Sequence, residues 1–169
     1  MDIYIDTEFT SLSDPRLISI GAVAAGGDAF YGVVENFPRR ACTRFVIEQV
    51  LPVLEHRPAN ACGSFDAVAR AFGDWLEGVS RHAARLRLVA DDECDIEMLR
   101  QLLLRAGCSE EDIGSACMLD PLSVQRGAQD AFRYWFQCHA DARLHNALDD
   151  ARAYRYALMG MHREQNRVP

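Results

Sequence analysis

The first 35 residues carry the apolar and polar pattern of three β-strands. In residues 3–9, Ile, Ile, Thr and Phe alternate with Tyr, Asp and Glu, which is the period of two that a strand shows. Residues 17–24 are apolar and partly β-branched, and residues 29–34 follow a Gly-Gly-Asp turn signal at residues 26–28. The pattern therefore predicts a three-strand meander.

From residue 64 onward, the spacing of the apolar positions becomes helical. Ser64 is placed to cap the first helix. The apolar face of that helix comprises Val68, Phe72, Trp75, Leu76 and Val79. A second helix is predicted from residue 95 to residue 106, with Gly107 ending it. Residues 123–139 and 147–162 predict two further helices.

Two short apolar segments between these helices, residues 86–90 and 116–119, are predicted to be strands. The order of elements is then three strands, helix, strand, helix, strand and two helices. Strands joined through helices pair in parallel, so we predict an α/β fold with a mixed sheet and helices on its faces. The sequence contains no repeat or linker, and residues 1–169 are predicted to form a single domain.

The composition, with 49% hydrophobic and 25% charged residues, is that of a globular protein and excludes intrinsic disorder. No apolar run approaches the ~20 residues of a membrane-spanning helix, and no basic leader is visible. We therefore expect a cytoplasmic protein with no membrane partner. The six cysteines form no CxxC pair, which favours reduced thiols over a zinc site. A net charge of −7 disfavours non-specific nucleic-acid binding.

Acidic residues supply the first candidate chemistry. Asp6 and Glu8 are two positions apart on a predicted strand, so both carboxylates point to one face. Such a pair is tolerated where a divalent cation lies between the carboxylates or where both face water. Asp95 is expected to point towards the core, although a carboxylate there also suits the helix dipole. Asp91 and Asp92 precede it and compete for the same role.

The segment HNALDDA, residues 145–151, begins the last predicted helix. Helical spacing turns Asp150 towards the apolar side and Asp149 towards the outside. Asn146 is placed as the N-cap. His145 lies before the helix on a loop, where it can act as a mobile base or simply be structural.

Four carboxylates and one histidine together form the candidate site, with the histidine expected at its edge. The carboxylates are Asp6, Glu8, Asp95 and Asp150, and the histidine is His145. Hard oxygen ligands suit Mg²⁺ or Mn²⁺ better than Zn²⁺. Two such ions ~3.5–4 Å apart can clamp the attacking and leaving oxygens of a phosphoryl displacement.

With these residues the sequence resembles the DEDDh 3′–5′ exonucleases, the superfamily of ribonuclease T, oligoribonuclease and the polymerase proofreading subunit. DTEFTSL at residues 6–12 resembles their first motif, and RLISIGAV at residues 16–23 resembles the strand that follows. The His-x4-Asp of residues 145–150 resembles the third motif. The resemblance spans residues 3–158 and is closest to small bacterial ribonuclease T-like exoribonucleases.

The sequence also departs from the family pattern. Ser11 stands where the family often has Gly. The second motif is the weakest: residues 89–99 read VADDECDIEML, and Asp95 fits the motif carboxylate best. Residues 107–143 resemble no family motif.

The resemblance implies a ribonuclease H-like fold and hydrolysis of single-stranded RNA, or RNA 3′ ends, to nucleoside 5′-monophosphates. The implied cofactors are two divalent cations, Mg²⁺ or Mn²⁺. The implied ligands are Asp6, Glu8, Asp95 and Asp150. His145 would take a proton from the attacking water, and Glu8 would share in catalysis.

The resemblance further implies contacts with the 3′-terminal nucleotide from Phe9, Thr10 and Leu12. Phe9 suits stacking on a base and Leu12 suits an apolar wedge, although both could be ordinary core residues. A homodimer is expected by analogy. It agrees with the large rings crowded into residues 132–136, which cannot all face one core.

Two other functions stay open from the sequence. One is a 3′–5′ DNA exonuclease of the trimming or proofreading type. The other is a catalytically silent nucleic-acid-binding module, against which the presence of all five candidate residues counts.

Overall fold

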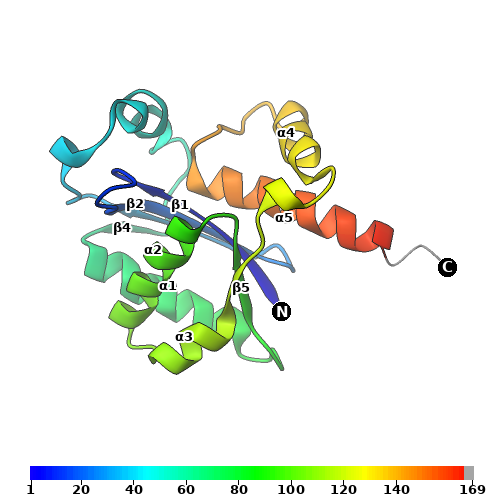
Figure 1. The fold of residues 1–169 in the computed structure, drawn as a ribbon. Coiled ribbons are helices and arrows are strands. Elements are labelled where there is room, and N and C mark those ends of the chain that lie inside the picture. Colours follow the sequence, from blue (N-terminus) through cyan, green and yellow to red (C-terminus); the bar gives the residue numbers. More distant parts are fainter. Residues whose placement is uncertain (166–169) are drawn as a thin grey trace.

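The structure, a computed structural model, describes the backbone of residues 1–165 and the side chains of residues 1–160. Six strands form one mixed sheet in the order β4-β3-β2-β1-β5-β6 (Figure 1). The strands are β1 (Asp2–Phe9), β2 (Leu17–Ala24), β3 (Ala29–Val34), β4 (Ala61–Gly63), β5 (Arg87–Ala90) and β6 (Cys117–Leu119). β1, β2 and β3 pair antiparallel, which confirms the predicted meander. β4, β5 and β6 add parallel pairs.

Helices cover both faces of this sheet (Figure 1). They are α1 (Phe65–Ser80), α2 (Glu93–Ala106), α3 (Glu110–Ala116), α4 (Ala128–Cys138) and α5 (Ala147–Gln165). α1 and α2 pack on one face, and α5 packs on the other with α4 beside it. The α/β class with a mixed sheet is therefore confirmed. No helix in the described part of the chain has both the length and the apolarity to cross a membrane.

Capping residues explain where the helices begin and end. The Ser64 side chain accepts a hydrogen bond from the N–H of Ala67, and Gly107 ends α2 in the left-handed conformation with φ 98°, as predicted. α2 begins two residues earlier than predicted, because the Asp92 side chain accepts from the N–H of Cys94 and caps the helix at Glu93.

Several elements were not predicted. Between β3 and β4 the chain forms three short helical turns, Arg39–Ala41, Val46–Val50 and Leu51–Val53, drawn in cyan in Figure 1. β4 and α3 are too short to show a clear apolar period. α4 begins at Ala128 rather than residue 123, because Gly127 before it adopts a positive φ of 81°.

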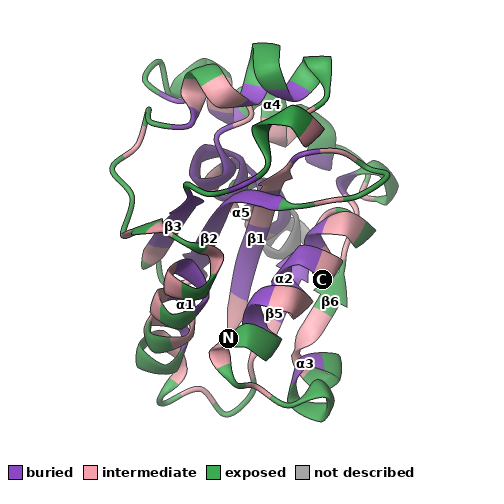
Figure 2. Ribbon diagram, turned by 90° about the vertical axis from the view of Figure 1, so that its left-hand side faces the viewer, coloured by how far each residue is buried: buried purple, intermediate pink, exposed green. Residues whose placement is uncertain are grey.

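The alternation of β1 divides the core and sets the position of the site. Ile3 and Ile5 lie in the main core, which includes buried residues of α1 and α2, whereas Tyr4 meets Tyr154 of α5 edge to face at 5.7 Å. In Figure 2 the strands β1 and β2 are largely buried, and the outer sides of α1 and α3 are exposed. By the same alternation Asp6 projects on the Tyr4 side of the sheet, under α5.

Gly21 allows α5 to approach that side closely. It pairs with Asp6 across β1 and β2, and a Cβ atom added there would lie 2.1 Å from the backbone oxygen of Ala147. No side chain fits in that space. The first turn of α5 therefore rests directly on the strand next to Asp6.

Candidate functional site

The predicted site residues come from three elements that meet at one end of β1. Asp6 and Glu8 lie on β1, Asp95 in the first turn of α2, and Asp150 in the first turn of α5. His145 lies on the loop just before α5, at a positive φ of 65° that is uncommon for a non-glycine residue. The fold thus brings residues from the two ends of the chain to one place.

Glu8, His145 and Asp150 form the tightest part of this site. One ligand atom of each lies within 4.8 Å of the others, and Asp6 and Asp95 are not in this mutually close set. Nδ1 of His145 lies 3.9 Å from Oε1 of Glu8, and the backbone N–H of His145 donates to Oδ2 of Asp150 at 2.9 Å. His145 is therefore held next to the carboxylates of Glu8 and Asp150.

Two carboxylate oxygens at this site are buried without a hydrogen-bond partner. They are Oδ2 of Asp6 and Oδ1 of Asp150, judged against the described residues. A buried, charged and unpaired carboxylate oxygen is costly, and either a proton or a bound cation removes that cost. The donor set is all oxygen apart from His145, which fits Mg²⁺ or Mn²⁺.

Asp95 is a buried carboxylate in the first turn of α2. Its Oδ1 accepts from the backbone N–H of Thr7 at 3.0 Å and from the Thr7 hydroxyl at 2.6 Å, so α2 is fastened to β1 beside Asp6. The two competing residues have other partners: Asp91 accepts from the N–H of Leu122, and Asp92 caps α2. Burial and position thus favour Asp95 as the candidate ligand.

The electrostatics show that these carboxyl groups are crowded. Burial, followed by mutual repulsion, raises the pKa of Asp6 and Glu8 well above the usual range. Burial raises the pKa of Asp95 to about 6 and that of Asp150 to about 8. Without a cation the cluster therefore retains protons near neutral pH, and a divalent ion would displace them. Burial lowers the pKa of His145, which keeps its ring neutral at pH 7.

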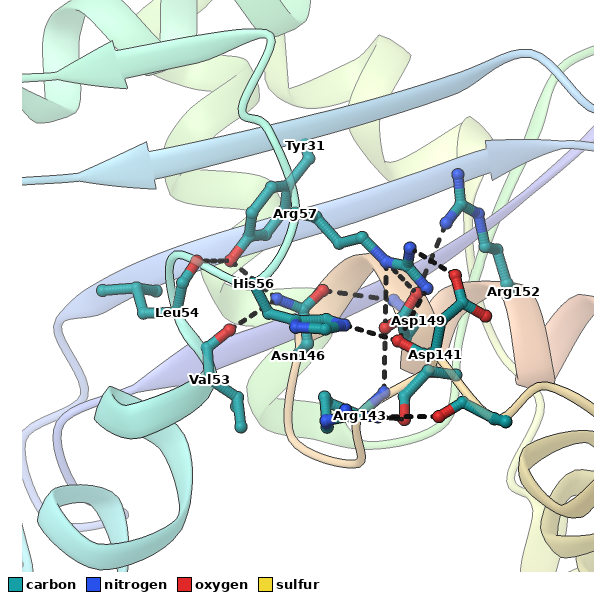
Figure 3. A network of polar contacts seen from close by, with 12 residues as sticks. Tyr31, Val53, Leu54, His56, Arg57, Asp141, Arg143, Asn146, Asp149 and Arg152 are labelled. Atoms are coloured by element: carbon teal, nitrogen blue, oxygen red, sulfur yellow. Dashed lines mark hydrogen bonds and ion pairs between the residues drawn. The ribbon is translucent and has the colours of Figure 1, made fainter.

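Asp149 corrects one prediction. Its side chain was expected to face outward, but it is fully buried and forms an ion pair with Arg57 at 2.8 Å (Figure 3). The sequence pattern shows one apolar stripe on α5, whereas in the structure the loop before the helix and the segment around Arg57 cover a second side. The predicted cap is confirmed, because Oδ1 of Asn146 accepts from the N–H of Asp149 at 3.4 Å.

A pocket of about 530 Å³ opens beside Glu8. Phe9 and Leu12 line it, and Leu12 is 77% exposed. Thr10 is fully buried instead: its hydroxyl donates to the backbone oxygen of Asp14 and accepts from the N–H of Arg16. Thr10 therefore shapes the loop that carries Leu12, whereas Phe9 and Leu12 face the space that a ligand could enter.

Phe45 also lines this pocket, and the sequence did not single it out. Its ring is 52% exposed and meets the ring of His145 edge to face at 4.9 Å. It lies next to the short turns between β3 and β4, where Val46, Val50 and Leu54 form a buried apolar face at helical spacing and Phe45 lies off that face. No signal in the sequence pointed to it.

Comparison with known proteins gives no assignment for this chain. No family model matches it, and no curated protein matches it. The residues and the geometry described above therefore carry the functional argument.

Proposed function

We propose that this protein is a metal-dependent 3′–5′ exonuclease of the DEDDh type, which shortens single-stranded RNA and releases nucleoside 5′-monophosphates. The observation that carries the proposal is the convergence of Glu8, His145 and Asp150 within 4.8 Å, beside a buried, unpartnered oxygen of Asp6. This combination of residue types and crowding suits a site that handles phosphate through cations.

The sheet supports a ribonuclease H-like assignment. Its strands β3, β2, β1, β5 and β6 are adjacent in that order, and β2 runs antiparallel to the strands β1 and β3 beside it. β1, which carries two of the acidic residues, is an inner strand of the sheet. The carboxylates thus sit on a strand that is paired along both edges.

Asp6, Glu8, Asp95 and Asp150 would hold two divalent cations, Mg²⁺ or Mn²⁺. When bound, these ions would stabilise the negative charge that develops during phosphoryl displacement. The neutral ring of His145 is suited to take a proton from the attacking water. Glu8, whose Oε1 lies 3.9 Å from Nδ1 of His145, would then stabilise the charged ring.

The apolar pocket supports a nucleotide as the substrate. Phe9, Leu12 and Phe45 line a space that borders Glu8, and aromatic and apolar side chains suit the flat face of a base. A 3′-terminal nucleotide bound there would have its phosphodiester next to the carboxylates. RNA is proposed as the substrate on the resemblance to small ribonuclease T-like enzymes.

A second copy of this chain is the proposed protein partner. Tyr134 on α4 is 54% exposed and Tyr156 on α5 is 45% exposed. Trp135, also on α4, is buried against α5. The rings of α4 therefore divide between the core and the surface, and those on the surface can meet a partner. Light scattering at micromolar concentration should give the mass of a dimer, and a monomeric mass would reject this part.

The proposal is tested by incubating labelled single-stranded RNA and single-stranded DNA with the protein and Mn²⁺, and then with EDTA. We expect shortening of RNA that EDTA abolishes. Shortening of DNA alone would assign the protein to the trimming or proofreading class. Binding without cleavage would indicate the catalytically silent module. Asp150→Asn is the control against a contaminating nuclease.

A further inference from the structure

One arginine joins two parts of the chain at the back of the site. Nε of Arg57 donates to both carboxylate oxygens of Asp149, at 2.8 and 3.1 Å (Figure 3). The same guanidinium group donates through Nη1 to Oδ2 of Asp141 at 2.9 Å and through Nη2 to the backbone oxygen of Asp141 at 3.3 Å. Arg57 thus connects the segment after the short helical turns with both α5 and the loop that precedes it.

This contact is shielded from water at its centre. The Asp149 side chain is fully buried, and that of Arg57 is 18% exposed. Asp149 also accepts a hydrogen bond from the backbone N–H of Arg143 at 3.0 Å, so its carboxylate binds the loop as well as Arg57. The planar guanidinium group makes charge-assisted bonds to Asp149 through Nε and to Asp141 through Nη1, and such bonds hold the partners in one orientation.

The loop held in this way carries His145. Only three residues separate Asp141 from His145, and α5 follows at Ala147. His145 has a positive φ, which a non-glycine residue retains only where its surroundings hold it. Its N–H bonds to Asp150, so the position of its ring depends on where the loop lies relative to the first turn of α5.

We propose that Arg57 is a positioning residue for His145. Through Asp149 and Asp141 it fixes residues 141–146 against α5 and thereby holds the histidine ring over Glu8. This inference rests on the proposed function, in which His145 accepts a proton. A base displaced by about 1 Å can cost roughly 100-fold in rate.

Arg57→Met and Arg152→Met form a matched pair for the test. Arg152 also contacts Asp149, with Nη1 at 3.3 Å from Oδ1, but it lies one turn further along the same helix and does not hold the loop. We expect Arg57→Met to lower kcat by about 10–100-fold with KM within about two-fold. Arg152→Met should retain kcat. Equal losses in the two variants would overturn the proposal.

A double variant separates positioning from mere stability. Arg57→Met alone leaves the buried Asp149 carboxylate short of a partner, which by itself destabilises the fold. Arg57→Met combined with Asp149→Asn removes both charges, so the melting temperature should recover while kcat stays low. Recovery of kcat together with the melting temperature would show a structural role only. Arg57→Lys, which can reach Asp149 but not fork to Asp141, should recover part of kcat.

Hydrogen exchange tests the same contact without any substrate. In Arg57→Met the backbone amides of residues 141–146 should exchange faster than in the wild type, and in Arg152→Met they should not. Unchanged exchange in Arg57→Met would overturn the positioning role. Absence of nuclease activity in the wild-type protein would instead reject the proposed function, and the exchange measurement would still decide whether Arg57 holds the loop.

Discussion

Asp149 and Asp150 are neighbours in the sequence and both are buried, yet their carboxylates have opposite surroundings. Asp149 is paired with Arg57 and with a backbone N–H of the preceding loop. Asp150 faces other carboxylates, and its Oδ1 has no partner among the described residues. One turn of α5 thus presents an ion-paired carboxylate to the scaffold and a carboxylate without a cationic partner to the candidate site.

This contrast predicts stability changes of opposite sign for two similar substitutions. Asp149→Asn removes the charge that balances Arg57 and should cost about 2–3 kcal/mol. Asp150→Asn removes a carboxyl group that must take up a proton on folding at pH 7, because burial raises its pKa to about 8, and should leave the metal-free protein at least as stable as the wild type. Urea unfolding at pH 7 in EDTA measures both. Destabilisation by Asp150→Asn with none by Asp149→Asn would mean that their roles are exchanged.

Divalent cations should stabilise the folded protein, because they bind the native carboxylate cluster and not the unfolded chain. Millimolar Mg²⁺ or Mn²⁺ should raise the melting temperature of the wild type and of His145→Ala, and Asp150→Asn should lose this response. His145→Ala should still lower turnover by roughly 10²–10⁴-fold, the scale for a general base. No shift with the wild type would argue against a metal site.

The pH dependence of the metal-free protein follows from the raised pKa of Asp150, about 8 against a usual value of 3.8. A carboxyl group whose pKa rises on folding stabilises the fold at low pH. That contribution is lost as the pH rises through the folded pKa. We therefore expect the wild type to lose stability relative to Asp150→Asn between about pH 4 and pH 8, measured by urea unfolding in EDTA. Mg²⁺ should abolish this trend, and a difference independent of pH would contradict it.

Gly21 should not tolerate a side chain. Gly21→Ala would place a Cβ atom 2.1 Å from the backbone oxygen of Ala147 and push the first turn of α5 off the sheet. The expected cost is about 2–3 kcal/mol, together with loss of the metal response, since Asp150 moves with that turn. Gly26→Ala is the control, because its nearest neighbouring atom is 3.7 Å away. Equal melting temperatures for the two variants would contradict the close approach.

Much of the fold could be predicted because its signals are local. Alternation over residues 3–9 and the caps at Ser64 and Gly107 depend on neighbouring residues only, and the structure confirms them. The sequence also named Glu8, His145 and Asp150, which the fold brings together, although their roles stay predictions.

The misses depended on contacts between distant segments. Asp149 is buried because Arg57, 92 positions earlier, lies against it, and no helical period reveals such a neighbour. Phe45 lies off the apolar face of the short turns beside it, and its contact with His145 exists only in the folded chain. The contact of Thr10 with a ligand stays a prediction; its hydroxyl bonds to backbone groups of its own loop.

The central claim is 3′–5′ hydrolysis at the carboxylate cluster, and the products of a 5′-labelled single-stranded RNA test it most directly. With Mn²⁺ the wild-type protein should give a ladder that descends one nucleotide at a time. A 3′-phosphate on the RNA should slow the reaction, and Asp150→Asn should give no ladder. Internal cuts at early times, or release of the labelled 5′ nucleotide first, would contradict the account.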